Sequence, residues 1–473
     1  MAISIYVAGL KSFFDDIIFI DIANKRIIYF GGTLILVSSA IFGSLFGLYS
    51  LLIIPALIFA FLSIKYLNFP LLLFLAVAPF VITLELSIIN FYNYGFVLWI
   101  GFLWSAKRLT ASSPFSIRYS QILIAFAALS IFLVFISIIP EGINNSEFLA
   151  IIRFILFFGI VLMLYDILDR KDIFSIIIAM SIPVIVASYF IFSVYSHSLN
   201  LVSILELLRY KVTGFLPNAN YFGLLLMIVL PFWISILLWW DNLSARISAG
   251  VMVAIFSLAM ILTNSRSAIL GFIVSLFAFS VWTKKTRYFI GISLLVVAFF
   301  VLVPQAHALL TAAFRLDRGT SSRTDIWSNT IEMIKENFWL GVGMGNYREV
   351  FYTYYSLGWE RGFYGHMPHA HNFILSKIAE FGIFGICIIG AIYYLPMRVC
   401  LRALKLCKTL KDTAIMRAFT AVLISYYVHS IFEGGGMLQE ARLYPEIIFW
   451  ILFILALKMN LYLENQAINP LKI

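Results

Sequence analysis

The sequence predicts an all-α polytopic membrane protein, and two observations lead to this fold class. Of the 473 residues, 62% are hydrophobic and 12% are charged, whereas soluble globular proteins have roughly 45–50% apolar and about 25% charged residues. Apolar stretches close to the roughly 20 residues needed to cross a bilayer follow one another along the chain. We expect about 12–14 transmembrane helices in a single integral membrane domain, residues 1–473, with one large loop at 305–371 carrying short helices.

The candidate spans can be taken in chain order. Residues 1–26 carry three aspartates between short apolar runs and lack a cleavage site, so we expect a cytoplasmic or interfacial lead-in rather than a removable signal peptide. Some of the first four spans are short, which leaves open that one pair is re-entrant. The predicted spans lie at about 27–43, 47–64, 69–88, 91–104, 119–139, 148–168, 173–195, 219–240, 246–263, 267–282, 288–304, 372–396, 414–433 and 444–460.

Basic residues cluster in alternate loops. The positive-inside rule places those loops, and both termini, in the cytoplasm. The net charge of +10 is thereby attributed to membrane topology and contact with membrane lipids, and no nucleic-acid partner is expected. The four clusters are Lys107, Arg108 and Arg118; Arg170 and Lys171; Lys284, Lys285 and Arg287; and Arg398, Arg402, Lys405, Lys408 and Lys411.

The segments 196–218, 264–266, 305–371 and 434–443 then share the opposite, outward side. Basic residues there run against the positive-inside bias, and an anionic substrate is one candidate reason. They are Arg209, Lys211, Arg266, Arg315, Arg318, Arg323, Arg348, Arg361 and Arg442.

Arg266 stands where one apolar stretch ends and the next begins, in the run Thr263-Asn264-Ser265-Arg266. A helix N-terminus favours anions through its free N–H groups, and a guanidinium supplies paired donors that match phosphate oxygens. The position therefore suits a diphosphate. An interfacial anchor that reaches toward lipid headgroups is the alternative.

The large loop predicts an amphipathic helix that starts at Ser322-Arg323-Thr324-Asp325, a pattern similar to a capping box. Arg323 would lie in its first turn, where a substrate contact and a solvated position on a packing helix both remain open. The apolar stripe expected on this helix consists of Trp327, Thr330, Ile331, Ile334 and Phe338.

The glycine run at 341–346, Gly-Val-Gly-Met-Gly-Asn, lacks the flanking strand and lysine of a nucleotide site, so it is interpreted as a flexible turn. Cys387, Cys400 and Cys407 have no metal or redox spacing and are expected to be packing residues.

His371 stands at the junction between the polar loop and the next apolar helix, where a histidine can take or give a proton near neutral pH. Neighbouring His366 and His369 raise the possibility of a metal, but no outward Asp-x-Asp accompanies them, and we expect no metal and no cofactor. Further along the helix, Lys377 and Glu380 suit a structural ion pair. Glu380 is nine positions from His371, about 180° around the helix, and is not expected to orient His371 directly.

These residues carry a resemblance to a known family. His371-Asn372, nine further residues and Gly382-x-x-Gly385 resemble the H[NSQ]-x9-G-x-x-[GTY] motif of the O-antigen ligase family, and Arg266-x-x-x-Leu270 resembles its R-x3-L motif. The segments GFLPNANYFG from 214, SSRTDIW from 321 and GVGMGNY from 341 are similar to further family segments, so the resemblance covers about residues 210–390.

The resemblance implies a multi-pass glycosyltransferase of the bacterial inner membrane, with its active site on the periplasmic face. Such enzymes move a glycan from an undecaprenyl diphosphate carrier to an acceptor hydroxyl, without a metal or a nucleotide sugar. The acceptor is the lipid A core in ligases, another carrier-linked glycan in polymerases and a protein in related enzymes. Carried over, His371 would be the general base and Arg266 and Arg323 would bind the diphosphate. Asn372 of the motif, and Arg209 and Lys211 among the outward basic residues, are further substrate-binding candidates.

We favour an O-antigen ligase acting in lipopolysaccharide biosynthesis, because both ligase-type motifs are intact. A polymerase of O-antigen or other polysaccharide repeats is the first alternative, since it must bind the same carrier and activate a sugar hydroxyl. A transporter of lipid-linked saccharide is the second, although the sequence shows no convincing inverted repeat. A scaffolding membrane protein would leave the outward arginines unexplained.

Overall fold

A computed structural model describes residues 68–81, 86–110, 120–138, 145–196, 219–303, 323–355, 369–434 and 443–468, together with the single positions 62, 63, 66, 216, 311 and 437. Across these residues the secondary structure is helical and contains no strand. Six of the described helices are long and apolar enough to cross a membrane. The predicted all-α polytopic membrane class is thereby confirmed.

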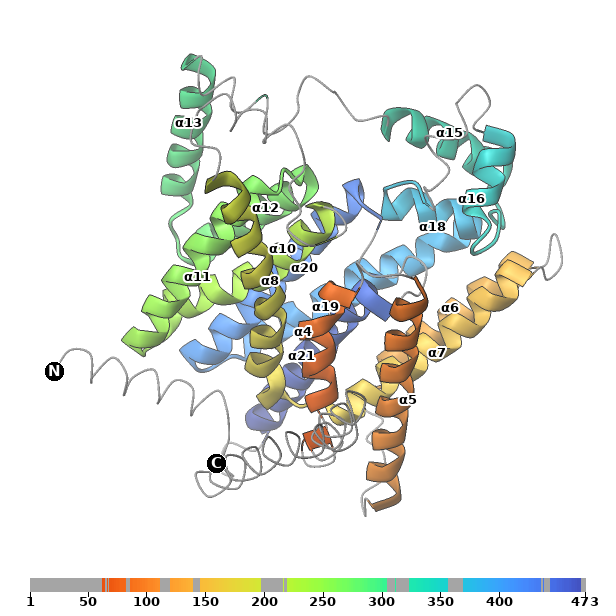
Figure 1. Cartoon of the computed structure of the whole chain (residues 1–473), viewed down its shortest axis with the longest axis horizontal. Helices are drawn as coiled ribbons and strands as arrows, with labels where there is room; N and C mark the ends of the chain where they lie inside the picture. The colour runs from red at the N-terminus through yellow and green to blue at the C-terminus, as the bar shows by residue number, and fades with distance from the viewer. Residues whose placement is uncertain are drawn as a thin grey trace, which may run out of the picture.

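The helices follow the predicted spans closely (Figure 1). In chain order they are α4 Phe69–Val81, α5 Leu86–Thr110, α6 Ser120–Ile138, α7 Asn145–Ile167, η2 Arg170–Asp172, α8 Ile173–Ser196, α10 Ala219–Trp239, α11 Leu243–Leu262, α12 Arg266–Trp282, α13 Thr286–Leu302, α15 Arg323–Glu336, α16 Tyr347–Val350, η4 Phe351–Tyr355, α18 Phe373–Phe381, η5 Gly382–Phe384, α19 Gly385–Leu406, α20 Leu410–Phe432 and α21 Leu443–Ile468.

One difference concerns the first spans, and two of those spans cannot be compared. The stretch expected at 91–104 belongs to α5, which has 25 residues and is longer than the sequence pattern indicated. The span at 27–43 and nearly all of that at 47–64 lie outside the described residues. The count of 12–14 helices therefore stays a prediction.

Helix α10 lies at the centre of the bundle, and most of its side chains are buried. A helix that is apolar on every side has no polar face to offer solvent, and so it packs into the interior. Its sequence, ANYFGLLLMIVLPFWISILLW, fits this rule. By contrast, large apolar side chains are exposed on α5, α11 and α13, among them Leu98, Val251 and Leu295, as is expected of surfaces that meet lipid.

Small residues bring α10, α12 and α20 into close contact. A Cβ atom on Gly223 of α10 would lie 2.6 Å from the Cβ of Ala268 in α12. A Cβ on Gly271 of α12 would lie 2.8 Å from the backbone oxygen of Ser425 in α20, and the Ser425 hydroxyl donates to the Gly271 oxygen at 3.1 Å. Such contacts are typical of membrane helix packing, which depends on close backbone approach.

The single span predicted at 372–396 is broken in the structure. Helix α18 ends at Phe381, a 3₁₀ turn covers Gly382–Phe384, and α19 starts at Gly385. Gly382 has φ of +58°, a conformation that costs little only for glycine. A Cβ on Gly385 would lie 2.2 Å from the Lys377 oxygen, so the break also requires a glycine there.

Three of the four basic loops meet at one end of the bundle. Arg108 at the end of α5 pairs with Asp166 at the end of α7, and Arg402 of α19 pairs with Glu464 of α21 at 2.9 Å. Arg170, between α7 and α8, lies against the same end of α21. The grouping agrees with placing these loops on one side of the membrane.

Candidate functional site

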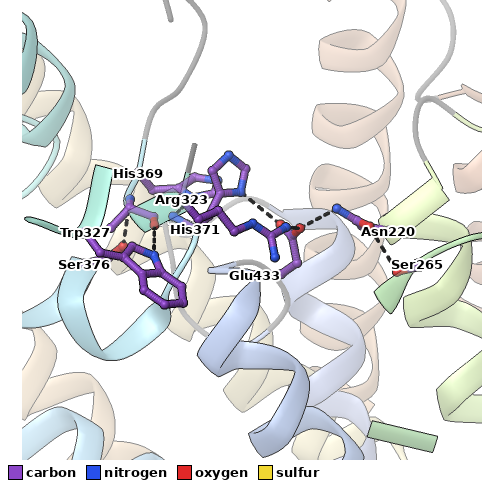
Figure 2. A network of polar contacts seen from close by, with 9 residues as sticks. Asn220, Ser265, Arg323, Trp327, His369, His371, Ser376 and Glu433 are labelled. Carbon is purple, nitrogen blue, oxygen red and sulfur yellow. Dashed lines mark hydrogen bonds and ion pairs between the residues drawn. The ribbon is translucent and has the colours of Figure 1, made fainter. Parts of the chain in front are cut away.

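A carboxylate at the opposite end of α20 organises a polar network. Glu433 follows the last residue of that helix, and 23 helical residues at about 1.5 Å each separate it from the basic end by roughly 35 Å. Its Oε1 accepts hydrogen bonds from Asn220 Nδ2 and Arg323 Nη2, and its Oε2 lies 3.0 Å from His371 Nδ1 (Figure 2). Glu433, which was not predicted as a site residue, thus contacts two of the predicted catalytic residues, Arg323 and His371.

Four separate elements build this network. Asn220 is in the first turn of α10, Arg323 starts α15, His371 precedes α18, and Glu433 caps α20. Glu433 is 9% exposed at its side chain, whereas Arg323 and His371 are 20% and 25% exposed. The carboxylate is therefore the buried anchor, and the Arg323 and His371 side chains are partly open to a ligand.

His371 has an uncommon backbone conformation, with φ of +50°. Non-glycine residues rarely adopt positive φ, and such strain persists only where the surroundings fix it. The preceding residue is held on both sides: Ala370 N–H donates to Ser376 Oγ at 3.2 Å, and Ala370 oxygen accepts from Trp327 Nε1 at 3.0 Å. The fold thus imposes the direction in which the His371 ring points.

Asn372, predicted to bind substrate, caps α18. Its Oδ1 accepts from the Leu375 N–H at 3.0 Å, which satisfies one of the free donors at the start of that helix. The motif position therefore has a structural task in this chain. A contact to substrate stays a prediction.

Arg266 starts α12, as the sequence indicated, and is half-buried. The preceding Ser265 makes no side-chain cap bond to that helix and instead donates through Oγ to Asn220 Oδ1 at 3.0 Å. Asn220 in turn donates to Glu433 (Figure 2). Arg266 therefore directly follows Ser265, a member of the network. It lies at the N-terminus of α12, where the Ser265 side chain makes no hydrogen bond to the N–H groups of the helix.

The charges around Glu433 decide its ionisation. Burial raises the pKa of a carboxyl group, but the hydrogen bond and charge of His371, together with the charge of Arg323, outweigh burial and lower the pKa of Glu433 to about 2. Glu433 is ionised at neutral pH, and it accepts hydrogen bonds without donating any.

A second histidine, His429, lies in the last turn of α20, four residues before Glu433. His429 is buried, and its ring nitrogens have no hydrogen-bond partner among the described residues. Ser267 of α12, the helix that contacts α20 at Gly271 and Ser425, is buried as well. The Ser267 hydroxyl is also without a hydrogen-bond partner among those residues. Buried polar atoms of this kind are usually satisfied by ordered water.

The glycine run at 341–346 is a docked turn rather than a flexible one. Val342 N–H donates to Ala379 oxygen at 2.9 Å, and Gly343 N–H donates to Glu380 oxygen at 3.0 Å. These bonds satisfy two carbonyl groups at the C-terminus of α18. Both donors are used within the protein, which agrees with the inference that this run does not cradle a nucleotide.

Helix α15 forms as predicted, with its buried face rotated. Thr330 is buried, and Trp327 and Ile334 are partly buried, but Ile331 and Phe338 are each 42% exposed. The positions that complete the buried face are Ile326 and Met333. Spacing alone could not identify this face, because the loop helix packs against α18 and η4 rather than a flat core.

Several other predicted residues can be placed. Lys377 Nζ donates to Glu380 Oε2 at 2.5 Å, and both are buried, so the structural ion pair is present. His369 packs edge-on against His371, with ring centroids 4.7 Å apart. No group of three potential metal ligands occurs in the described part of the chain. Arg209, Lys211 and His366 lie outside the described residues.

The fold and this network define a multi-pass membrane protein with a histidine–carboxylate–arginine site at one end of its helix bundle. Comparison with protein families adds that residues 251–390 match the O-antigen ligase family. The match covers both motifs, and it confirms the resemblance inferred from them for this segment of the chain. No curated protein matches the chain.

The matched segment contains Arg266, Arg323 and His371, whereas Asn220 and Glu433 lie outside it. Sequence reasoning missed both. One feature of the sequence could have identified Glu433. It is an acidic residue at the end of a predicted apolar span, on the side that carries the outward basic residues, and a charge at the membrane boundary needs a partner.

Proposed function

We propose that this protein is a glycosyltransferase that moves a glycan from an undecaprenyl diphosphate carrier to an acceptor hydroxyl on the periplasmic face of the bacterial inner membrane. Specifically, we infer an O-antigen ligase that joins O-antigen to the lipid A core in lipopolysaccharide biosynthesis. The observation that carries the proposal is the joining of His371 and Arg323 through one carboxylate, beside the start of α12, in a chain that matches the O-antigen ligase family over residues 251–390.

The chemistry needs a base for the acceptor and cations for the leaving group. His371 accepts the acceptor hydroxyl proton while the new bond between that oxygen and the sugar anomeric carbon forms. The bond from the anomeric carbon to the phosphate oxygen breaks, and its electron pair leaves on the lipid diphosphate. Arg266 and Arg323 stabilise the negative charge that develops there, more strongly than they would in bulk water.

A single displacement with inversion suits these groups. A covalent intermediate requires a carboxylate free to attack the sugar. Glu433 is committed to three donors, Asn220, Arg323 and His371, and is better placed to orient than to attack.

Metal-independent transfer is the direct test. Purified protein in nanodiscs is expected to transfer glycan from an undecaprenyl diphosphate donor in the presence of a chelator, with no nucleotide sugar. Strict dependence on added divalent metal would contradict this mechanism and favour His366, His369 and His371 as ligands. Movement of intact donor across the bilayer, without transfer, would instead support the transporter alternative.

The glycan profile of a deletion strain separates ligase from polymerase. Loss of a ligase leaves full-length glycan on its carrier, because only the final joining step is missing. Loss of a polymerase leaves single repeats on a normal acceptor. The second profile would overturn the ligase assignment while leaving the carrier chemistry in place.

A further inference from the structure

Glu433 contacts both groups that the proposed reaction needs. One oxygen accepts from Arg323 and the other lies 3.0 Å from His371 Nδ1. We propose that Glu433 is a positioning residue which orients His371 as a base and occupies Arg323 until the donor diphosphate displaces it. This inference rests on the proposed function, since it assigns a task to Glu433 within that reaction.

The contact with His371 fixes which ring nitrogen can act as the base. An ionised carboxylate can only accept, so the 3.0 Å contact requires a proton on Nδ1. Nε2 then carries the free lone pair and can take the proton of the acceptor hydroxyl. Glu433 is ionised at neutral pH because its pKa is low, so it can act only as the acceptor in this contact. The arrangement matches the way a buried carboxylate orients histidine in other hydrolytic and transfer enzymes.

The contact with Arg323 should weaken donor binding, whereas the contact with His371 favours transfer. Arg323 is a candidate ligand of the diphosphate, yet in the free protein its Nη2 donates to Glu433 Oε1. A guanidinium prefers to bind phosphate oxygens through paired donors, so the arriving diphosphate and Glu433 compete for the same fork. Asn220 Nδ2 and His371 still hold the carboxylate once Arg323 turns to the donor.

Removing the charge of Glu433 should therefore move two measurements in opposite directions. In Glu433→Gln the competitor for Arg323 is neutral, so undecaprenyl diphosphate-linked glycan should bind about 3- to 30-fold more tightly, a fraction of the worth of one charged hydrogen bond. The amide can donate to Nδ1 and shift the proton to Nε2, so transfer per bound donor should fall by about 10²- to 10⁴-fold.

Two further variants make the test specific. Glu332→Gln removes one negative charge from the exposed face of α15, the helix that Arg323 starts, and should leave both measurements near wild type. Glu433→Asp keeps the charge on a shorter side chain and should restore donor affinity toward wild type while transfer recovers only in part. Thermal unfolding of each variant in the same nanodiscs checks that the fold is retained.

The outcomes separate the inference from the proposed function. Tighter donor binding with slower transfer in Glu433→Gln supports the inference. Weaker binding together with slower transfer in a folded protein would overturn it and leave Glu433 a structural anchor. Failure of the wild-type protein itself to bind or use the donor would instead overturn the proposed function.

Discussion

His371 and Arg266 should fail in different ways when substituted, because one is assigned to the acceptor and the other to the donor. In His371→Ala the base is lost while the cations remain, so donor binding should stay within a few-fold of wild type. Transfer should fall by about 10²- to 10⁴-fold, the range for loss of a general base. Donor affinity and single-turnover rates measured in one nanodisc preparation check this, and near-normal turnover would remove His371 from the mechanism.

Arg266→Lys keeps the charge at the start of α12 but loses the planar fork. An arginine-to-lysine change is not conservative where phosphate is bound through paired donors. Donor affinity should weaken by about 10-fold, the equivalent of roughly 1.4 kcal/mol. Arg287→Lys, at an exposed position in the first turn of α13, is the matched control. Unchanged affinity in Arg266→Ala would leave this arginine as an interfacial anchor.

The individual site residues differ in how far sequence predicts them. His371 and Arg266 could be identified because each stands beside a recognisable local pattern, a loop-to-helix junction and a helix start. Glu433 could not, because its significance depends on α20 ending beside α15 and the loop before α18, and those contacts join residues 110 and 62 positions apart. Asn220 is in the same situation, with 213 positions between it and Glu433.

At the scale of elements, Gly382 of the family-like motif and Gly341 of the glycine run have a structural explanation. The backbone segments around Gly341 and Gly382 lie very close together. A Cβ on Gly341 would lie 2.5 Å from the backbone of Glu380, and a Cβ on Gly382 would lie 2.5 Å from the backbone of Trp339. The resulting contact anchors α15 and the glycine turn against the end of α18. His371 precedes α18 and Arg323 starts α15, so this contact joins the two elements that carry these candidate site residues.

Gly341→Ala is expected to destabilise the protein. Gly341 has φ of +73°, and the added Cβ would clash with the backbone of Glu380, so both strain and overlap oppose the substitution. The cost should be on the order of 1–3 kcal/mol. Thermal unfolding in detergent measures it, with Gly390→Ala as control, since a Cβ there meets nothing within 4 Å. Equal melting temperatures for the two variants would contradict the contact.

The hydrophobic pattern predicted most helix positions because each span is long and apolar, but it could not predict the break after Phe381. Residues 372–396 are nearly continuous in apolar character. The helix ends because Val342 and Gly343 bind its last carbonyl groups, and these donors come from a loop about 40 residues earlier in the sequence. The rotation of the buried face of α15 has the same origin, namely packing against partners that are distant in sequence.

At the scale of the whole molecule, the two ends of the bundle have different characters. Arg108, Arg170 and Arg402 gather at one end with the carboxylates of α7 and α21. The Glu433 network lies at the other end of α20. A bilayer hydrocarbon core is about 30 Å thick, close to the roughly 35 Å length of α20, so the two ends should face opposite compartments.

Cysteine labelling in intact cells tests this topology. In a variant whose native Cys387, Cys400 and Cys407 are replaced by alanine, a new cysteine at Ser328 on the exposed face of α15 should react with a membrane-impermeant maleimide once it has passed the outer membrane. A cysteine at Lys408 should react only after the inner membrane is permeabilised, because the positive-inside rule places that loop in the cytoplasm. Retained glycan transfer by the parent without cysteines shows that the fold is intact. Labelling of both positions from outside would place the basic loop on the same side as α15, and it would contradict the assignment of the two ends of α20 to opposite compartments.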